Sequence, residues 1–452
     1  MSESHELHES SASPASSPVY RIPGLVVTER TFSVPLDHAV PDGEQISVFA
    51  REVRAPGGER RPWLVYLQGG PGFGGPRPSG SAGSGAVGGW IGRAVRDFRV
   101  LLLDQRGTGR STPVNRQTVP ARGDASQQAD YMARFRADSI VRDCELIRQE
   151  LSGDEPWTVL GQSFGGFCAV SYLSLAPSGL RRVLICGGLP SLDAHADDVY
   201  RAAYPRMVRK NEGFYARYPE DVEQARRIVG YLSENDVTLP NGMLLTAEAF
   251  QSLGLMLGMS DGFDRMHYLL EGALLSVGGR VELSDEFQEE AQNTLSFAGH
   301  PIYAILHEPC YAQGGKPTAW SAERVRGEFP EFNAGRATSG DAPLLFTGET
   351  IHPWHFRTDP SLRPLREAAD LLAERTEWAP LYDASVLASN QVPVAAIVYA
   401  EDLYVDAAHS SQTAERIKGL RRWITNEYEH DGLRTSGDVV FERLWRMADG
   451  EL

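Results

Sequence analysis

A serine in a glycine-bounded turn gives this sequence its clearest indication of chemistry. Residues 161–165 read Gly-Gln-Ser-Phe-Gly, the spacing G-x-S-x-G, with a buried strand predicted before them and a small, apolar helix after them. A serine on such a tight strand-to-helix turn projects its hydroxyl out of the sheet, and the flanking glycines remove side chains that would collide there. The helix N-terminus beneath favours the negative charge that develops in acyl transfer. The pattern predicts Ser163 as a catalytic nucleophile.

A serine nucleophile needs a general base to take its proton, and the base needs an acid that orients it. In sheets that carry this turn, the three residues follow in the chain order serine, acid, histidine. His430 comes after a predicted strand at 421–425 and is the predicted base. The other late histidine, His409, falls where a surface helix is expected to begin.

The acid is expected in the loop that follows an earlier predicted strand, at 392–399. The carboxyl ends of strands are where α/β sheets place their sites. Asp402 is preferred over Asp406 because it lies nearer the strand end, while Glu401 and Asp406 remain alternatives.

Two backbone N–H groups must stabilise the oxyanion that forms during acyl transfer. One is expected from Phe164, the residue after the nucleophile. The other is expected from Gly70, within the Gly-Gly-Pro-Gly at 69–72 that directly follows a predicted strand at 63–68. Glycine suits this position because it lets bare backbone approach an anion.

Apolar runs that alternate with helical patterns predict a mainly parallel α/β sheet with right-handed crossovers. In the first part of the chain, the helix is expected at 138–151 and the strands at 25–34, 45–53, 63–68, Arg99–Asp104, 157–161 and 182–187. A mostly helical stretch follows, with candidate helices at 200–211, Asp221–Glu234, 246–257, 263–277 and 285–297. The last part returns to strands and helices in alternation, at 392–399, 413–417, 421–425 and 437–447.

These changes of pattern divide the chain into four parts. Residues 1–18 are rich in serine, proline and glutamate and are expected to form a disordered tail. Residues 19–188 and 390–452 are expected to form one α/β domain, and 189–389 a helical insertion that caps it.

Charge and composition disfavour several classes of protein. The 452 residues carry 44 basic and 60 acidic side chains, a net charge of −16, which repels phosphate backbones and anionic lipid. No apolar run approaches the roughly 20 residues of a membrane span, and the first residues lack the features of a signal peptide. Four cysteines without a C-x-x-C pair favour a reducing compartment. We expect a cytoplasmic protein that binds neither nucleic acid nor membrane, and the oligomeric state stays open.

Two histidine-containing segments, at 307–310 and 352–355, hint at metal ligands without the pattern of a known site. Neither reads H-E-x-x-H, and each contains a proline that breaks a helix. We therefore expect neither a metal nor a cofactor.

Three motifs together resemble those of the proline iminopeptidases of the α/β-hydrolase superfamily. The family motifs H-G-G-P-G, D-Q-R-G-x-G-x-S and G-x-S-[WF]-G-G have similar segments here, in the same order, at 68–72, 104–111 and 161–166. Gln68 replaces the histidine of the first motif, but activity need not be lost because the oxyanion donor there is backbone. The resemblance covers about 65–188 and 392–447 and places Asp402 and His430 at the family's usual separation. It implies an α/β-hydrolase fold, with a mainly parallel central sheet and a large, mostly helical cap inserted between strands.

The resemblance also implies an activity, the release of an N-terminal residue, often proline, from a peptide through a Ser-His-Asp acyl-enzyme mechanism. The substrate is then a peptide with a free N-terminus, whose ammonium pairs in the family with carboxylates of the cap. A buried carboxylate pairs with a cation and rejects blocked N-termini. Glu308 is the first candidate for this carboxylate and Glu349 the second, because both lie in locally apolar segments of the insertion.

An esterase or amidase with the same triad is the nearest alternative, because only the cap distinguishes it from an aminopeptidase. An epoxide hydrolase or a haloalkane dehalogenase is disfavoured, since these enzymes use an aspartate where this chain has Ser163. A binding protein of this fold that had lost catalysis is expected to lack part of the triad, whereas every member is present.

Overall fold

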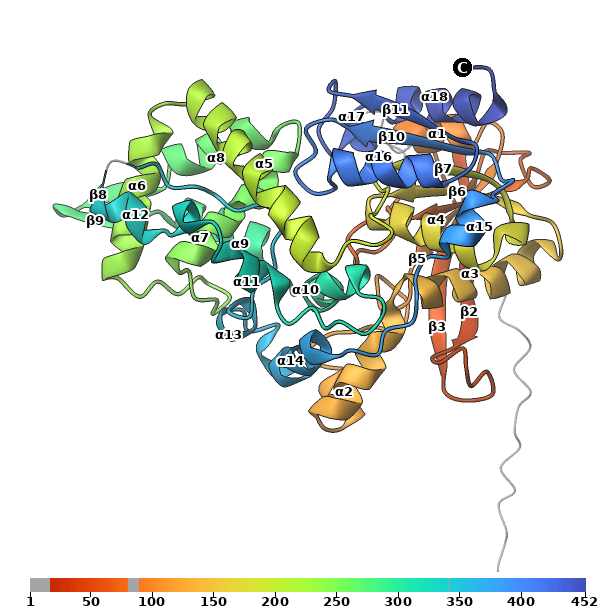
Figure 1. The fold of residues 1–452 in the computed structure, drawn as a ribbon, viewed down its shortest axis with the longest axis horizontal. Helices are drawn as coiled ribbons and strands as arrows, with labels where there is room; N and C mark the ends of the chain where they lie inside the picture. The colour runs from red at the N-terminus through yellow and green to blue at the C-terminus, as the bar shows by residue number, and fades with distance from the viewer. Residues whose placement is uncertain (1–16, 80–88, 341) are drawn as a thin grey trace, which may run out of the picture.

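A nine-stranded sheet forms one half of the molecule, on the right in Figure 1. The computed structural model describes residues 17–79, 89–340 and 342–452, so nearly all of the tail predicted at 1–18 lies outside the described residues. In order across the sheet, the strands are β1 (Val19–Ile22), β2 (Leu25–Pro35), β3 (Gln45–Arg54), β5 (Arg99–Asp104), β4 (Trp63–Leu67), β6 (Trp157–Gln162), β7 (Leu180–Cys186), β10 (Val394–Tyr399) and β11 (Leu420–Thr425). From β5 onward they run parallel, whereas β1, β2 and β3 join antiparallel. The predicted mainly parallel sheet is confirmed.

Helices cover both faces of this sheet. The helices of the sheet region are α1 (Gly89–Ala94), α2 (Ala125–Met132), α3 (Ala137–Ser152), α4 (Phe164–Leu175), α15 (Ala384–Ala388), α16 (Ala407–Arg416), α17 (Gly432–Thr435) and α18 (Gly437–Asp449), and α2 packs against the insertion instead of the sheet. Successive side chains of a strand point to opposite faces. Val65 of β4 therefore enters a core with α3 and α4, whereas its neighbour Leu64 enters a separate core with α1 and α18.

Between β7 and β10 the chain forms a large, mostly helical insertion, which Figure 1 shows gathered at one side of the sheet. Its helices are α5 (Ala196–Arg217), α6 (Asp221–Glu234), α7 (Ala247–Ser252), α8 (Gly262–Glu271), α9 (Asp285–Leu295), α10 (Pro301–Leu306), α11 (Ser321–Arg326), α12 (Gly335–Ser339), α13 (His355–Thr358) and α14 (Arg366–Glu374). Helix α15 packs beside α4 and α16 of the sheet region. Among the described helices, none is long and apolar enough to cross a bilayer.

The helix expected at 263–277 is wrong in its second half. Helix α8 ends at Glu271, and the chain continues as a hairpin of β8 (Leu274–Val277) and β9 (Arg280–Leu283). The two residues between these strands, Gly278 and Gly279, have φ of 57° and 83°, which a two-residue hairpin turn requires. This turn chemistry outweighs the apolar periodicity that suggested a longer helix.

Arg106, in the loop after β5, is fully buried and ties several segments together. Its Nε donates to Asp143 Oδ2 of α3 at 2.7 Å, and its Nη1 donates to the carbonyls of Leu36 and Arg134 at 2.9 and 2.7 Å. The buried charge of Arg106 is tolerated because these partners compensate it. Removing Arg106 would leave the carboxylate of Asp143 buried without an opposite charge.

Replacing Arg106 by Met should lower the free energy of unfolding by about 3–5 kcal/mol, because the Asp143 carboxylate would be buried without its partner. Urea denaturation of the purified variants measures this change. Arg110→Met is the matched control, since Arg110 lies in the same loop with its side chain 52% exposed. A loss below about 1 kcal/mol for Arg106→Met, the range of exposed pairs, would contradict the assignment.

Candidate active site

Ser163 occupies the sharp turn between β6 and α4 with φ of 54°, a backbone conformation that side-chain-bearing residues rarely adopt. Its neighbours leave no room for side chains. A Cβ on Gly161 would lie 2.3 Å from the Gly165 carbonyl oxygen, and one on Gly165 would lie 1.9 Å from the Leu67 carbonyl oxygen. Both glycines of G-x-S-x-G are thus required by close backbone contacts that hold the serine at the end of the sheet.

His430 and Asp402 are buried together and joined by a hydrogen bond. Nδ1 of His430 lies 2.7 Å from Oδ2 of Asp402, and the two residues are 5% and 1% exposed. The other carboxylate oxygen, Oδ1, accepts from the backbone amides of Tyr404 at 2.8 Å and Val405 at 3.1 Å. Because Asp402 occupies Nδ1, Nε2 is the ring nitrogen of His430 left to accept a proton.

The two alternative acids have other partners. Asp406 accepts from the amide of His409 at the start of α16 and forms an ion pair with Arg206 at 2.6 Å. Glu401 has a side chain that is 58% exposed, and its nearest cation is 4.0 Å away. Of the three carboxylates, the structure pairs Asp402 with His430.

The pKa of His430 is raised above its ordinary value although burial by itself would lower it. The charge of Asp402 and its hydrogen bond outweigh burial, and the charges of Glu349 and Asp431 add to them. The surroundings of His430 thus favour its protonated form, the imidazolium.

The Gly-Gly-Pro-Gly loop after β4 lies against the nucleophile. A Cβ on Gly69 would come within 2.8 Å of the Ser163 Cβ, so only bare backbone fits there. The D-Q-R-G segment at 104–107 holds this loop through two hydrogen bonds. Gln105 Nε2 donates to the Gln68 carbonyl at 3.2 Å, and Asp104 Oδ1 accepts from the Gly75 amide at 2.7 Å. Part of the glycine-rich stretch, 80–88, lies outside the described residues.

A cavity of about 270 Å³ opens on these residues. Ser163, His430 and Gly70 line one side of it. The remaining lining is mostly apolar or aromatic and comes largely from the insertion, with Phe73, Leu255, Met259, Leu295, Phe297, His300, Tyr303, Ile351 and Tyr404 among its members. Ser163 and His430 therefore face a small, largely apolar cavity.

The two candidate amine-binding carboxylates lie in different surroundings. Glu349 lines the cavity, where Tyr303 donates its hydroxyl to Oε1 at 2.7 Å. Glu308 is not among the lining residues: its oxygens accept from the amides of Ser321 and Ala322, at 3.0 and 2.9 Å, at the start of α11. Burial raises the pKa of Glu308 to about 7, against these hydrogen bonds. The geometry thus reverses the order expected from the sequence and favours Glu349, because Glu308 is used to cap a helix.

Comparison with known proteins identifies the family. The α/β hydrolase fold family matches residues 62–233. A proline iminopeptidase of Aeromonas sobria is 49% identical over 436 residues, which cover 96% of this chain and 99% of that protein. The chain belongs to the proline iminopeptidase family. A proline iminopeptidase of Aspergillus aculeatus is 37% identical over 434 residues, covering 94% of each chain. The resemblance drawn from the three motifs is confirmed.

Some residues of this proline iminopeptidase-family site were not found from the sequence. Tyr404 packs edge-on against His430, with ring centroids 4.7 Å apart, and donates its hydroxyl to the Leu255 carbonyl of the insertion. Tyr303 orients Glu349 from a helix 46 residues earlier in the chain. The sequence offered one indication that Tyr404 belongs to the site, the apolar Leu-Tyr-Val within the otherwise acidic loop 401–406. No sequence pattern indicated Tyr303.

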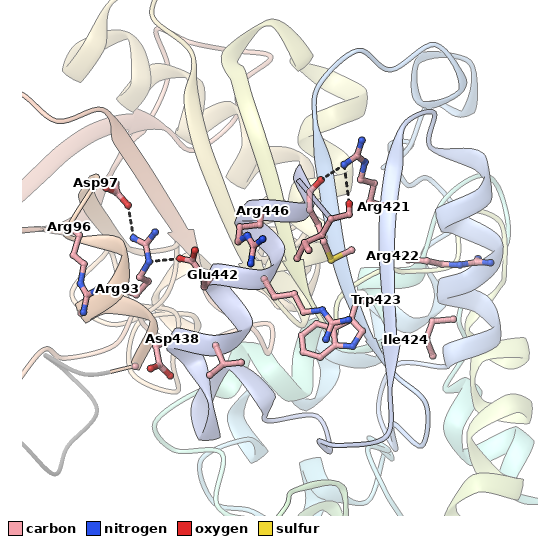
Figure 2. Close-up of a pocket in the computed structure, with 16 residues that line it drawn as sticks. Arg93, Arg96, Asp97, Arg421, Arg422, Trp423, Ile424, Asp438, Glu442 and Arg446 are labelled. Carbon is pink, nitrogen blue, oxygen red and sulfur yellow. Dashed lines mark hydrogen bonds and ion pairs between the residues drawn. The ribbon is translucent and has the colours of Figure 1, made fainter. Parts of the chain in front are cut away.

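A second, larger hollow of about 1530 Å³ lies between α1, β11 and α18 and is lined by other residues (Figure 2). Six arginines and three acidic residues line it, and Arg93 pairs with both Asp97 and Glu442. Strand β11 is an edge of the sheet, where Arg421 and Arg422 discourage pairing with another strand. The lining of this hollow includes none of the predicted site residues. The hollow is therefore part of the charged surface.

The raised pKa of His430 predicts the pH dependence of the proline iminopeptidase-family triad. Because the imidazole must be neutral to take a proton, kcat/KM should rise with pH through a midpoint above the ordinary histidine value of about 6.5. Glu349→Gln should move this midpoint to lower pH, since the charge of Glu349 helps to raise it. The profile is measured with an uncharged aryl ester, so that amine binding does not contribute. A midpoint below the ordinary value in the unmodified protein would contradict the geometry.

Proposed function

We propose that this chain is a serine aminopeptidase that releases the N-terminal residue, with proline preferred, from peptides whose N-terminus is free. The observation that carries the proposal is the presence of a carboxylate, Glu349, in the same small cavity as Ser163 and His430. A free ammonium has to lie there against apolar walls, which is tolerable only beside an opposite charge. The names of the two similar proteins, both proline iminopeptidases, support the preference for proline.

The geometry supports a two-step acyl transfer. Ser163 Oγ attacks the carbonyl carbon of the first residue while Nε2 of His430 takes the hydroxyl proton. The backbone N–H groups of Gly70 and Phe164 stabilise the oxyanion. As the peptide bond breaks, His430 gives the proton to the leaving amine, and the acyl group stays on Ser163. Water, deprotonated by the same imidazole, then releases the amino acid and restores the serine.

We also propose that the protein works in the cytoplasm. Its four cysteines are all free and buried, as suits a reducing compartment: Cys144, Cys168, Cys186 and Cys310.

Replacing Ser163 by Ala should lower kcat by roughly 10⁴–10⁶-fold while leaving the fold intact, because the acyl-enzyme can no longer form. Hydrolysis of prolyl-arylamide and a thermal melt of the same preparation measure the two effects. A serine-directed phosphonate should add one label to the unmodified protein, at Ser163, and none to the variant. Activity near that of the unmodified protein, or labelling at another serine, would refute the assignment.

Glu349→Gln should reduce kcat/KM for prolyl-arylamide, because the substrate ammonium loses its charged partner. The reduction should correspond to a loss of about 2–5 kcal/mol in transition-state stabilisation. An uncharged aryl ester should be much less affected, since the triad is untouched. Glu308→Gln is the matched control and should leave both substrates unaffected, because Glu308 caps α11.

Blocking the substrate amine should reproduce the loss in the unmodified protein. If N-acetylprolyl-arylamide is cleaved as well as the free form, the aminopeptidase proposal fails and the alternative, an esterase or amidase of the same fold, replaces it.

A further inference from the structure

Helix α5 of the insertion places a buried arginine against the loop that carries the catalytic acid. Arg206 is 8% exposed. Its Nη1 donates to the backbone carbonyl of Asp402 at 2.9 Å, and its Nη2 pairs with Oδ2 of Asp406 at 2.6 Å. One planar guanidinium thus holds both ends of the turn 402–406, from a helix almost 200 residues away in the sequence.

Apart from His430, which contacts Oδ2, the groups that hold the carboxylate of Asp402 lie within this turn. Its Oδ1 is held by the amides of Tyr404 and Val405, and the far end of the turn is anchored where Asp406 caps α16. A shift of the turn therefore moves the carboxylate and, with it, the partner of His430. Arginine suits this position because its rigid fork of donors can bind two acceptors in one plane.

A second cation on the same helix holds the loop of the histidine. Lys210, one helical turn after Arg206, pairs with Glu429 Oε1 at 2.5 Å, and Glu429 immediately precedes His430. Residues four apart share one face of a helix. The same face of α5 therefore contacts the loop of the acid and the loop of the base, and helps to set their separation.

We propose that Arg206 is a positioning residue of the triad, which acts through Asp402 by holding its carboxylate against His430. The inference rests on the triad of the proposed function. It assigns the insertion a second task besides enclosing the cavity: it completes the alignment of the catalytic loops.

Arg206→Met should lower kcat by about 10–100-fold with little change in KM, because a misplacement of about 1 Å at a catalytic group costs up to a hundredfold. The pH profile provides a readout that a merely structural residue would not move. The charged groups that face His430 are Asp402, Glu349 and Asp431, with Glu429 paired to Lys210. Loss of the Arg206 cation alone would raise the pKa of His430, whereas a displaced Asp402 lowers it. We expect the acid limb of kcat/KM to move to lower pH.

The test compares Arg206→Met with four other variants, one of them a double variant, using the full chain and prolyl-arylamide. Arg209→Met, on the same helix with its side chain 54% exposed, is the matched control and should leave activity and profile unchanged. Arg206→Lys replaces the two-pronged guanidinium by a single nitrogen, and its kcat should lie between those of the unmodified protein and Arg206→Met. In an Asp402→Asn background, Arg206→Met should add less than about threefold, because residues that act through one another do not add.

The outcomes separate this inference from the proposed function. If Asp402→Asn leaves kcat near that of the unmodified protein, the triad is wrong. If Asp402→Asn is crippled while Arg206→Met keeps its activity, the positioning inference is wrong and the triad stands. The positioning inference is also overturned if Arg206→Met lowers kcat by the same factor in the Asp402→Asn background as in the unmodified protein. It is overturned as well if Arg206→Met leaves the acid limb of kcat/KM at its original pH. Should Arg206→Met fail to fold, Arg206→Lys and Asp406→Asn test the same contacts.

Discussion

The hydrogen bond between His430 and Asp402 is the contact on which the rest of the site depends. It is 2.7 Å long and buried, and it decides which nitrogen of the imidazole is free. The sheet brings its partners together: β10 and β11 are parallel neighbours, with Tyr399 opposite Thr425, so the loops after them begin side by side. An acid three residues past one strand and a histidine five residues past the other can therefore meet.

The nucleophile is held by a constraint of space. Glycines from three segments converge at Ser163: those of the turn between β6 and α4, of the loop after β4 and of the loop after β7. A Cβ on Gly188, in the loop after β7, would lie 2.2 Å from the serine carbonyl oxygen. The insertion lines much of the cavity with apolar and aromatic side chains and one carboxylate, Glu349. In the proposed function, the strand ends therefore carry the reaction chemistry and the insertion selects the substrate.

Local patterns were sufficient for much of this account. The strand at Arg99–Asp104 and the helix at Asp221–Glu234 have the predicted bounds, because burial and periodicity there are strong and uninterrupted. Ser163 could be proposed because it directly follows the buried strand β6, and Asp402 and His430 because they lie in the loops after β10 and β11. The carboxyl ends of parallel strands share one edge of the sheet.

Contacts between distant segments could not be predicted. Glu308 and Glu349 both lie in apolar surroundings, and only the fold shows that one caps α11 while the other faces the cavity. Arg206 looks like any arginine of an amphipathic helix, and its partner lies 196 residues further along the chain. Such pairings depend on how the insertion meets the sheet, which no local pattern encodes.

The most direct measurement is a ¹⁵N NMR spectrum of the His430 ring, assigned by comparison with His430→Gln and recorded at a pH where the imidazole is neutral. We expect the single ring proton on Nδ1, in a hydrogen bond to Asp402, with Nε2 unprotonated. Asp402→Asn should abolish this arrangement. A proton on Nε2 in the unmodified protein, or a spectrum that Asp402→Asn leaves unchanged, would contradict it.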